Sequence, residues 1–282
     1  MGDPAEAKAG TAALFDRTAQ TYDRAGADFF ARAAAELVAA AAPRPGERVV
    51  DVGCGRGANL FPAALAVGPQ GSAVGIDLAP AMVAATAAEA RERGLTHVRV
   101  LVGDAEAPGL PDGSADLVIA AFLLFLLPDP DAAVRAYRRL LAPGGRLAVA
   151  TFAEDADPDR TYAAVLGRAL GEYFPPARPA VPGEPPHPMH RLRTRAAVTE
   201  LLAGAGFTGF AFAEREHVLT YPDGAAFVRW LWSTGARGAL EAVPADRLAE
   251  AEAAVAAEAE RTLRGPAGTL ALSMPGRVTI AR

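Results

Sequence analysis

The sequence predicts an α/β fold in which a seven-stranded, mostly parallel sheet carries helices on both faces, with helical and loop insertions that cap it. Short apolar runs alternate with segments of helical composition through the first half of the chain, which is typical of parallel strands joined by helical crossovers. The first apolar run leads directly into a glycine-rich turn. Hydrophobic residues make up 51% of the 282 residues, which is enough for a large core.

The apolar runs and the breaks between them define the elements of the first half. We expect strands at residues 49–52, 73–77, 97–102, 115–121 and 147–152, and helices at residues 29–42, 59–67, 79–94 and 131–141. Prolines and glycines separate these elements, as at residues 43–46 and 143–146. Asn59 is a good N-cap, and Pro62 is tolerated in the first turn of the helix that begins there.

The second half departs from this alternation. Residues 155–193 are rich in proline, and we expect them to cap the pocket of an acceptor molecule. The elements expected after them are a helix at 194–206 capped by Thr194, a strand near 207–214 that could reach residue 220, helices at 227–232 and 248–263, and strands at 269–274 and 278–281. These last strands would close the sheet at an antiparallel end.

The chain shows neither an internal repeat nor a separate linker, so we expect a single domain over residues 1–282. Its core would comprise residues of about 30–154 and 194–221 together with 269–282. An N-terminal lid segment would cover residues 11–28, and two cap insertions would cover residues of about 155–193 and 222–265.

Composition and charge exclude several classes of protein. The net charge of −5 leaves no basic surplus to neutralise phosphates, which argues against a nucleic-acid partner. A single cysteine, Cys54, leaves no pair for an intrachain disulfide, and no spacing suits a metal site. The first ten residues show no signal peptide, and the longest apolar run, residues 117–127, is too short to span a bilayer. We therefore expect a cytoplasmic protein, either a monomer or a homodimer.

The glycine-rich turn is the strongest indication of a ligand. Asp51, Gly53, Gly55 and Gly57 form the pattern D-x-G-x-G-x-G directly after the first strand, where backbone N–H groups can approach a ligand closely. A dinucleotide site prefers G-x-G-x-x-G. An acidic residue at the start of the turn would also repel a pyrophosphate but attract a cation. The turn therefore favours S-adenosylmethionine (SAM), which carries an ammonium, a sulfonium and a carboxylate, over NAD. Cys54 is interpreted as a small residue that fills the turn.

Acidic residues also follow the next two strands. Asp77 lies at the end of the second strand, where its carboxylate can accept both ribose hydroxyls of an adenosyl group, a feature that SAM and NAD share. Asp104 follows the third strand. Acidic residues at three successive strand ends strengthen the interpretation of an adenosyl site. Leu78 and Met82 would flank the adenine, although Met82 fits a plain core position equally well.

Residues 49–57 resemble the first motif of class I SAM-dependent methyltransferases, which have a Rossmann-like sheet. Residues 103–106 resemble the G-D-A-E/Q motif of that family, and residues 15–23 match F-D-x-x-A-x-x-Y-D of the ubiquinone/menaquinone-biosynthesis C-methyltransferase-like group (methyltransferase type 11). The resemblance runs from about residue 14 to residue 153. It implies SAM as the cofactor and S-adenosylhomocysteine as its product.

The resemblance also implies roles for individual residues. Asp104 would accept the adenine amine, and the Ala105 N–H would donate to a ring nitrogen. Tyr22 would lie near the methionyl end, either as a cation–π partner or as core packing. The predicted cofactor-binding residues are Tyr22, Asp51, Gly53, Cys54, Gly55, Asn59, Asp77, Leu78, Met82, Gly103, Asp104, Ala105, Ala121, Phe122 and Leu126.

The sequence departs from relatives after the fourth strand. Relatives carry a histidine pair before Leu-Pro-Asp, whereas Phe125 and Leu126 occupy those places here and give an apolar wall. His187 and His190, in the proline-rich segment, are the candidate catalytic residues. His97 starts a strand at the wrong end of the sheet, and His217 is left undecided.

These observations predict an enzyme of the EC 2.1.1 class that moves a methyl group from SAM to a C, O or N atom of a small hydrophobic acceptor, such as a secondary metabolite or a quinone-like compound. Methyl transfer can proceed largely by positioning and desolvation, so a base is needed only if the acceptor must lose a proton. Two alternatives keep the cofactor: a cyclase or pericyclase that uses SAM structurally, and a non-catalytic SAM-binding regulator. A dehydrogenase is disfavoured by the glycine spacing.

Overall fold

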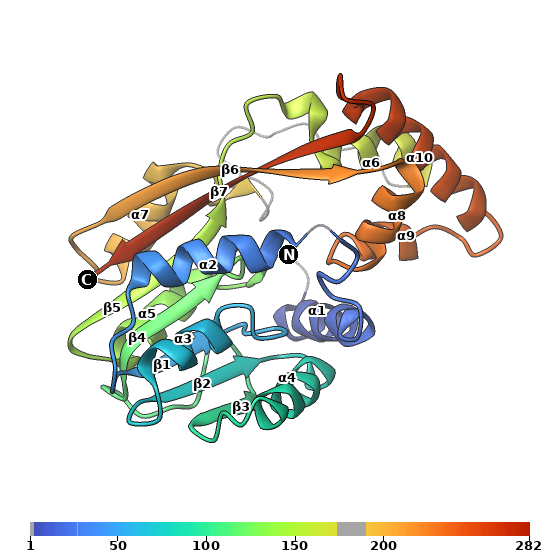
Figure 1. The fold of residues 1–282 in the computed structure, drawn as a ribbon. Helices are drawn as coiled ribbons and strands as arrows, with labels where there is room; N and C mark the ends of the chain where they lie inside the picture. Colours follow the sequence, from blue (N-terminus) through green and yellow to red (C-terminus); the bar gives the residue numbers. More distant parts are fainter. Residues whose placement is uncertain (1–2, 27, 174–189) are drawn as a thin grey trace.

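The computed structural model describes residues 3–26, 28–173 and 190–282, which build one sheet of order β3-β2-β1-β4-β5-β7-β6 (Figure 1). The strands are β1 (Arg48–Val52), β2 (Ser72–Asp77), β3 (Val98–Val102), β4 (Ala115–Ala121), β5 (Leu141–Phe152), β6 (Ala211–Tyr221) and β7 (Leu270–Ala281). β1 to β5 pair in parallel, whereas β7 is antiparallel to both β5 and β6. The predicted seven-stranded α/β fold is confirmed.

Helices cover both faces of this sheet, as Figure 1 shows. They are α1 (Pro4–Thr18), α2 (Phe29–Ala41), α3 (Leu60–Val67), α4 (Pro80–Glu92), α5 (Pro130–Leu140), α6 (Tyr162–Leu170), α7 (Arg195–Gly204), α8 (Gly224–Trp232), α9 (Arg237–Glu241) and α10 (Leu248–Leu263). Side chains of α2 and α3 share one buried cluster with those of α8 and α10, and side chains of α5 and α7 form a second one. α6, α8, α9 and α10 gather beside one end of β6 and β7.

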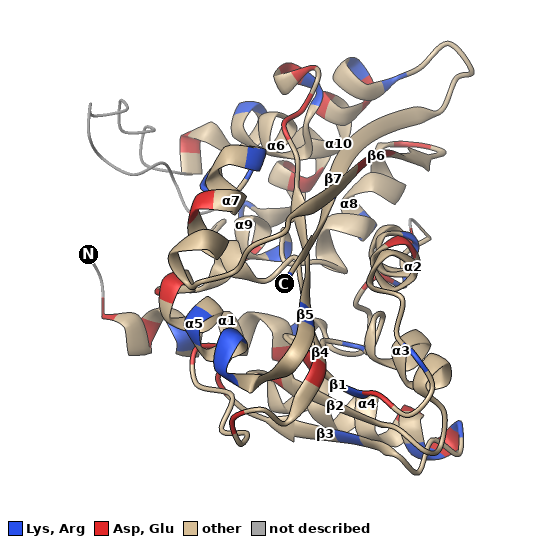
Figure 2. Cartoon of the chain, turned by 90° about the vertical axis from the view of Figure 1, so that its left-hand side faces the viewer, with Lys and Arg blue, Asp and Glu red and all other residues tan. Residues whose placement is uncertain are grey.

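The central strands are buried because their residues are apolar on both faces, as a strand covered by helices on two sides requires. Val49, Val50 and Val52 of β1 are each at most 3% exposed. The carboxyl ends of β1 to β4 consequently meet at one protected edge of the sheet. Figure 2 shows basic and acidic residues interspersed along the described helices and loops in that view.

Four details differ from the sequence prediction. Asn59 precedes α3 but does not cap it, because its backbone is already helical (φ −93°, ψ −38°) and its side chain makes no capping hydrogen bond. β5 begins at Leu141 rather than residue 147, since residues 142–145 form an irregularity in its pairing with β4. β7 runs unbroken through Pro275, and β6 starts later, at Ala211.

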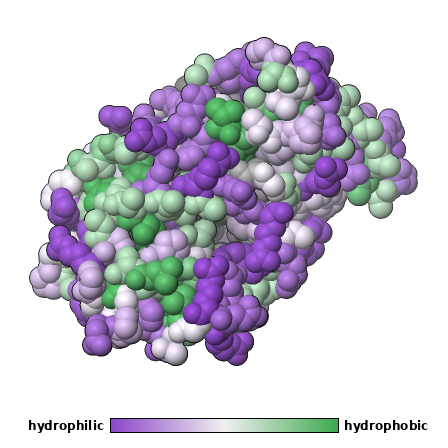
Figure 3. Space-filling model, in the orientation of Figure 1, coloured by the Kyte–Doolittle hydropathy of each residue, from purple (hydrophilic) through white to green (hydrophobic). Residues whose placement is uncertain are grey.

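Two surface features complete the description. No helix among the described residues is long and apolar enough to cross a membrane. The face seen in Figure 3 mixes apolar and polar residues. Leu65, Val102 and Val218 are the large apolar side chains most exposed within the described part of the chain, and they come from three separate elements.

Candidate functional site

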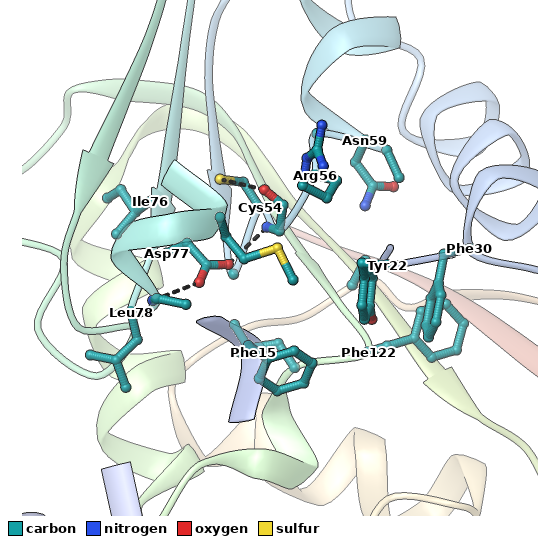
Figure 4. Close-up of a pocket in the computed structure, with 18 of the residues that line it drawn as sticks. Phe15, Tyr22, Phe30, Cys54, Arg56, Asn59, Ile76, Asp77, Leu78 and Phe122 are labelled. Carbon is teal, nitrogen blue, oxygen red and sulfur yellow. Dashed lines mark hydrogen bonds between the residues drawn. The ribbon is translucent and has the colours of Figure 1, made fainter. Parts of the chain in front are cut away.

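A cavity of about 370 Å³ lies at the carboxyl edge of β1 to β4 (Figure 4). The glycine turn after β1 forms its floor, and the loops after β2, β3 and β4 form its sides. α1 and the segment that follows it close the remaining side. Its volume falls within the range of small-molecule sites in proteins.

The glycine turn has a backbone that only glycine adopts easily. Gly53, Gly55 and Gly57 all have positive φ, and a Cβ on Gly57 would lie 2.6 Å from an atom of the Phe61 ring. A hydrogen bond from α4 stabilises the turn, because the Thr86 hydroxyl donates to the Gly55 carbonyl at 2.7 Å. Its backbone is thus held in one shape before any ligand arrives.

Asp77 connects the turn to the next strand. Its Oδ2 accepts the Gly55 N–H at 2.8 Å, and its Oδ1 accepts the Ala79 N–H at 2.9 Å (Figure 4). Burial raises the pKa of Asp77, while these N–H donors oppose that shift. Each carboxylate oxygen keeps a second lone pair for a ligand hydroxyl.

Asp51 lies beneath the same turn and is fully buried. Neither of its carboxylate oxygens has a hydrogen-bond partner among the described residues, and the same holds for Oδ1 of Asn59. Burial, together with the charge of Asp77, raises the pKa of Asp51 well above its ordinary value. The ionised form of Asp51 is therefore costly in the empty site, where no cationic side chain among the described residues offsets it, and a positively charged ligand bound beside it would restore that form.

The far end of the cavity carries Asp104, just after β3. Lys8 of α1 donates to its Oδ2 at 2.7 Å and to Oε2 of Glu106 at 2.5 Å. Glu106 in turn accepts the Asp129 N–H through Oε1, at 2.7 Å. The N-terminal helix is thereby tied to the loops after β3 and β4.

Aromatic rings form the wall between α1 and α2. Phe15, Tyr22, Phe30 and Phe122 contact one another in that order, with ring centroids 5.9, 5.3 and 5.5 Å apart (Figure 4). Burial raises the pKa of the Tyr22 phenol, so it stays neutral. These rings exclude water from the part of the cavity next to the glycine turn.

A guanidinium holds the segment after α1 against the glycine turn. Nη1 of Arg56 donates to the Ala19 carbonyl at 2.5 Å, and its Nη2 contacts Glu89 at 3.2 Å. Asp16 adds a second link, because its Oδ1 accepts the Ala81 N–H at the start of α4. Residues 15–23 therefore lie over the cavity through contacts with the glycine turn and with the first turn of α4.

The structure brings the predicted cofactor residues together. All of them line the cavity except Asp51, which lies directly behind it. Their contacts with a cofactor remain a prediction. Sequence reasoning missed Lys8 and Arg56, because their partners lie far away along the chain.

The candidate catalytic histidines, unlike most of the predicted cofactor residues, are not found among the described residues that line the cavity. His187 lies outside the described residues, and His190 is exposed and does not line the cavity. His97 contacts the Ala64 carbonyl at 2.9 Å. His217 is buried in β6 against Phe29, and it also does not line the cavity. Within the described chain, no histidine side chain faces the cavity.

Comparisons with known proteins point to one group. A family model described as a methyltransferase domain matches residues 49–145. The chain is 41% identical over 256 residues to nocamycin O-methyltransferase of Saccharothrix syringae, which covers 89% of each protein. It is 48% identical over 134 residues to aklanonic acid methyltransferase DauC of Streptomyces sp. (strain C5), covering 48% of this chain and 61% of that protein. The crystal structure of the YcgJ protein of Bacillus subtilis has the same fold, with a TM-score of 0.56, 21% identity, and coverage of 89% of this chain and 97% of that one.

Proposed function

The chain belongs to the class I SAM-dependent methyltransferases, and we propose that it transfers the methyl group of SAM to a small hydrophobic secondary metabolite, with oxygen as the favoured acceptor atom. The observation that carries the proposal is the cavity itself. It combines carboxylates that lack cationic partners with an aromatic and apolar wall. A cationic cofactor and a flat apolar acceptor are the pair of ligands that suits such a lining.

The residues present fit the cofactor. Both oxygens of Asp51 are buried without a partner among the described residues, which is costly unless a positive group neutralises them. Asp77 would hold the ribose hydroxyls with its free lone pairs. Asp104 and the Ala105 N–H would recognise the adenine edge, as the sequence predicts. Gly53, Gly55 and Gly57 have no side chains, which would leave room for the methionyl group beside the turn.

SAM supplies an activated methyl group on a sulfonium that leaves as a neutral thioether. The chain contributes binding, orientation and exclusion of water. Tyr22 and Phe122 would hold the cofactor and acceptor against each other, while Leu126 keeps the side of the cavity apolar. Because methyl transfer passes through an in-line arrangement of three atoms, a rigid wall raises the rate without any proton transfer by these residues.

The relatives support an acceptor of this kind. One relative's name is nocamycin O-methyltransferase and another's is aklanonic acid methyltransferase, and both names describe enzymes of secondary metabolism. We also propose that the chain acts as one domain, with residues 11–28 as a lid over the cofactor and with residues 222–265 as part of a cap over the acceptor.

Incubation with SAM carrying a deuterated methyl group, followed by mass spectrometry of candidate acceptors, tests the proposal. Methyl transfer predicts a product heavier by the labelled methyl group and an equal amount of S-adenosylhomocysteine. Turnover of an acceptor without label would instead favour the cyclase alternative, for which the absence of a histidine among the described cavity residues leaves room. Binding of SAM without any turnover would favour a regulator.

A further inference from the structure

Asp23 is a carboxylate of the cavity wall that the cofactor does not account for. It lies between α1 and α2 with a left-handed backbone (φ 54°), a conformation that costs free energy in any residue other than glycine. Its Oδ2 accepts the Ala31 N–H at 3.2 Å, in the first turn of α2. Its own N–H donates to the Ser233 carbonyl at 3.2 Å, beyond the end of α8. Asp23 thus connects the lid segment, to which it belongs, with α2 and with the residue after α8.

The second oxygen of Asp23 is uncommitted. Oδ1 is buried and has no hydrogen-bond partner among the described residues, although Asp23 lines the cavity. A buried carboxylate oxygen in this state loses its hydration and gains nothing in return. Such an atom is retained where a ligand completes its hydrogen bonding.

The other carboxylates that line the described cavity are already engaged. Glu89 contacts the guanidinium groups of Arg56 and Arg93. Both oxygens of Asp77 accept backbone N–H groups, and Asp104 contacts Lys8. Since Asp77 and Asp104 also serve the cofactor in the proposed function, Asp23 is the remaining carboxylate in the described lining that can meet the acceptor.

We propose that Asp23 binds the hydroxyl group of the acceptor and takes its proton during methyl transfer, so that the acceptor class is a flat phenol or enol. This inference rests on the proposed function. In the step, the O–H bond breaks and its proton passes to the Asp23 carboxylate. The acceptor oxygen forms a C–O bond to the methyl carbon, and the C–S bond breaks with its electron pair remaining on sulfur. Asp23 then releases the proton to solvent with the product.

The acceptor class follows from the neighbours of Asp23. Tyr22 precedes it, and Phe30 stacks on Tyr22 with ring centroids 5.3 Å apart. Ala31 and Ala34 of α2 line the same side of the cavity without bulky side chains. A planar ring with a hydroxyl at its edge matches a wall of this composition, in which aromatic faces surround one hydrogen-bond acceptor.

The charge state of Asp23 suits a base. Burial raises its pKa to about 6 and the charge of Asp28 adds to the rise, while the backbone N–H groups of Ala31, Phe30 and Phe29 at the start of α2 oppose it. The other ionisable groups near it are Tyr22 and Arg24 beside it in the chain, Arg32 of α2 and Tyr221 of β6. A carboxylate of this kind is ionised at pH 7 and still basic enough to receive a proton in the transition state.

Asp23→Asn tests the inference, because asparagine keeps an oxygen for the Ala31 N–H but cannot take a proton. With 2-naphthol as the probe acceptor, we expect the rate of methylation to fall by about 100-fold or more. The wild-type rate should rise with pH through about 6, and the variant should lose this rise. Asp28→Asn is the matched control, since Asp28 has a similar backbone (φ 48°) but is exposed and outside the cavity lining. Because the charge of Asp28 raises the pKa of Asp23, this variant should keep the rate measured at high pH and shift the rise to lower pH.

A second readout does not depend on turnover. In the presence of S-adenosylhomocysteine, the Asp23 carboxylate should repel the phenolate form of 4-nitrophenol, so that the bound probe has a higher pKa in the wild type than in Asp23→Asn. The absorbance of the bound phenolate measures this difference, and a purely structural role would not produce it. Binding of S-adenosylhomocysteine should be equal in both proteins.

Any of four results would overturn the inference: an unchanged pH profile in Asp23→Asn, equal pKa values of the bound probe, a loss of S-adenosylhomocysteine affinity as large as the loss of rate, or wild-type protein that binds neither phenol. If the wild type methylates an amine or a carbon acid but leaves both phenols unchanged, the proposed function holds and this inference fails. If no acceptor gains a labelled methyl group, the proposed function itself fails.

Discussion

Replacement of Asp77 by alanine should separate cofactor binding from the shape of the glycine turn. The carboxylate accepts two backbone N–H groups, from Gly55 at 2.8 Å and from Ala79 at 2.9 Å, and each oxygen has one lone pair left for a ribose hydroxyl. A hydrogen bond to a charged group contributes about 1.5–3 kcal/mol net of its exchange with water. The two ribose contacts share one carboxylate and are not fully additive, so we expect a total loss of about 2–4 kcal/mol, which is roughly 30- to 700-fold in the dissociation constant.

Isothermal titration calorimetry with S-adenosylhomocysteine measures this loss directly. The substitution also frees the Gly55 and Ala79 N–H groups, so a loosened turn could weaken binding by itself. Thr86→Val controls for that effect, since Thr86 holds the Gly55 carbonyl at 2.7 Å but does not line the cavity. We expect Thr86→Val to weaken binding by less than about fivefold, the effect of a single neutral hydrogen bond. An equal loss in both variants, or a loss below fivefold in Asp77→Ala, would refute the assigned contact with ribose.

Three further predictions concern the lid, the turn and the charge of the cavity. Arg56→Met removes the 2.5 Å hydrogen bond to the Ala19 carbonyl, so S-adenosylhomocysteine should dissociate about 5- to 20-fold faster, as measured by stopped-flow fluorescence. An unchanged dissociation rate would show that the lid segment closes without the Arg56 contact. Gly57→Ala should lower the free energy of unfolding by about 1–3 kcal/mol more than Gly46→Ala, because both glycines have positive φ but only a Cβ at position 57 would meet the Phe61 ring. Equal midpoints of urea unfolding for the two variants would contradict this. Burial raises the pKa of Asp23 from 3.8 to about 6, so the folded state binds this proton more tightly and the wild type loses stability as the pH rises through that window. The free energy of unfolding of Asp23→Asn should therefore increase by about 1–3 kcal/mol relative to that of the wild type between pH 4 and pH 8. A difference that does not change with pH would argue against a buried carboxylate.

The positions of the first four strands could be predicted from sequence because each is a short apolar run followed by a turn with local signals. The same locality explains why Asp51, Asp77 and Asp104 could be placed. Each one lies within two residues of the last residue of a parallel strand, and parallel strands of one sheet present their carboxyl ends at the same edge. The glycine turn was predictable for a similar reason, since its conformation depends on the residues within it.

Contacts between distant segments could not be predicted. Lys8 meets Asp104 across 96 positions of the chain, and the sequence near Lys8 contains no pattern that identifies its partner. Arg56 occupies a position between the glycines that the D-x-G-x-G-x-G pattern leaves unspecified, yet its guanidinium reaches the Ala19 carbonyl. Such pairs depend on how α1 folds back over the sheet, and local propensity contains no information about that.

Asn59 shows where a local rule fails for a physical reason. An N-cap residue normally has an extended backbone, from which its side chain can reach the N–H groups of the first turn. The glycine turn delivers Asn59 already in helical conformation, so its side chain lies along the cavity instead. The residue type was informative about the site, although its predicted role as a cap was wrong.

Carboxylates within this chain fall into two groups that differ in what compensates them. Asp116 lies away from the cavity, where hydrogen bonds from Arg48 lower its pKa, so its charge contributes to the fold. Asp51 and Asp77 have raised pKa values because burial outweighs the donors around them, and no arginine or lysine among the described residues contacts them. Ionising these two carboxylates therefore costs free energy in the empty protein, and a bound cationic ligand would offset that cost. The contrast between the two groups, rather than the number of acidic residues, is the physical basis for assigning a sulfonium cofactor to this edge of the sheet.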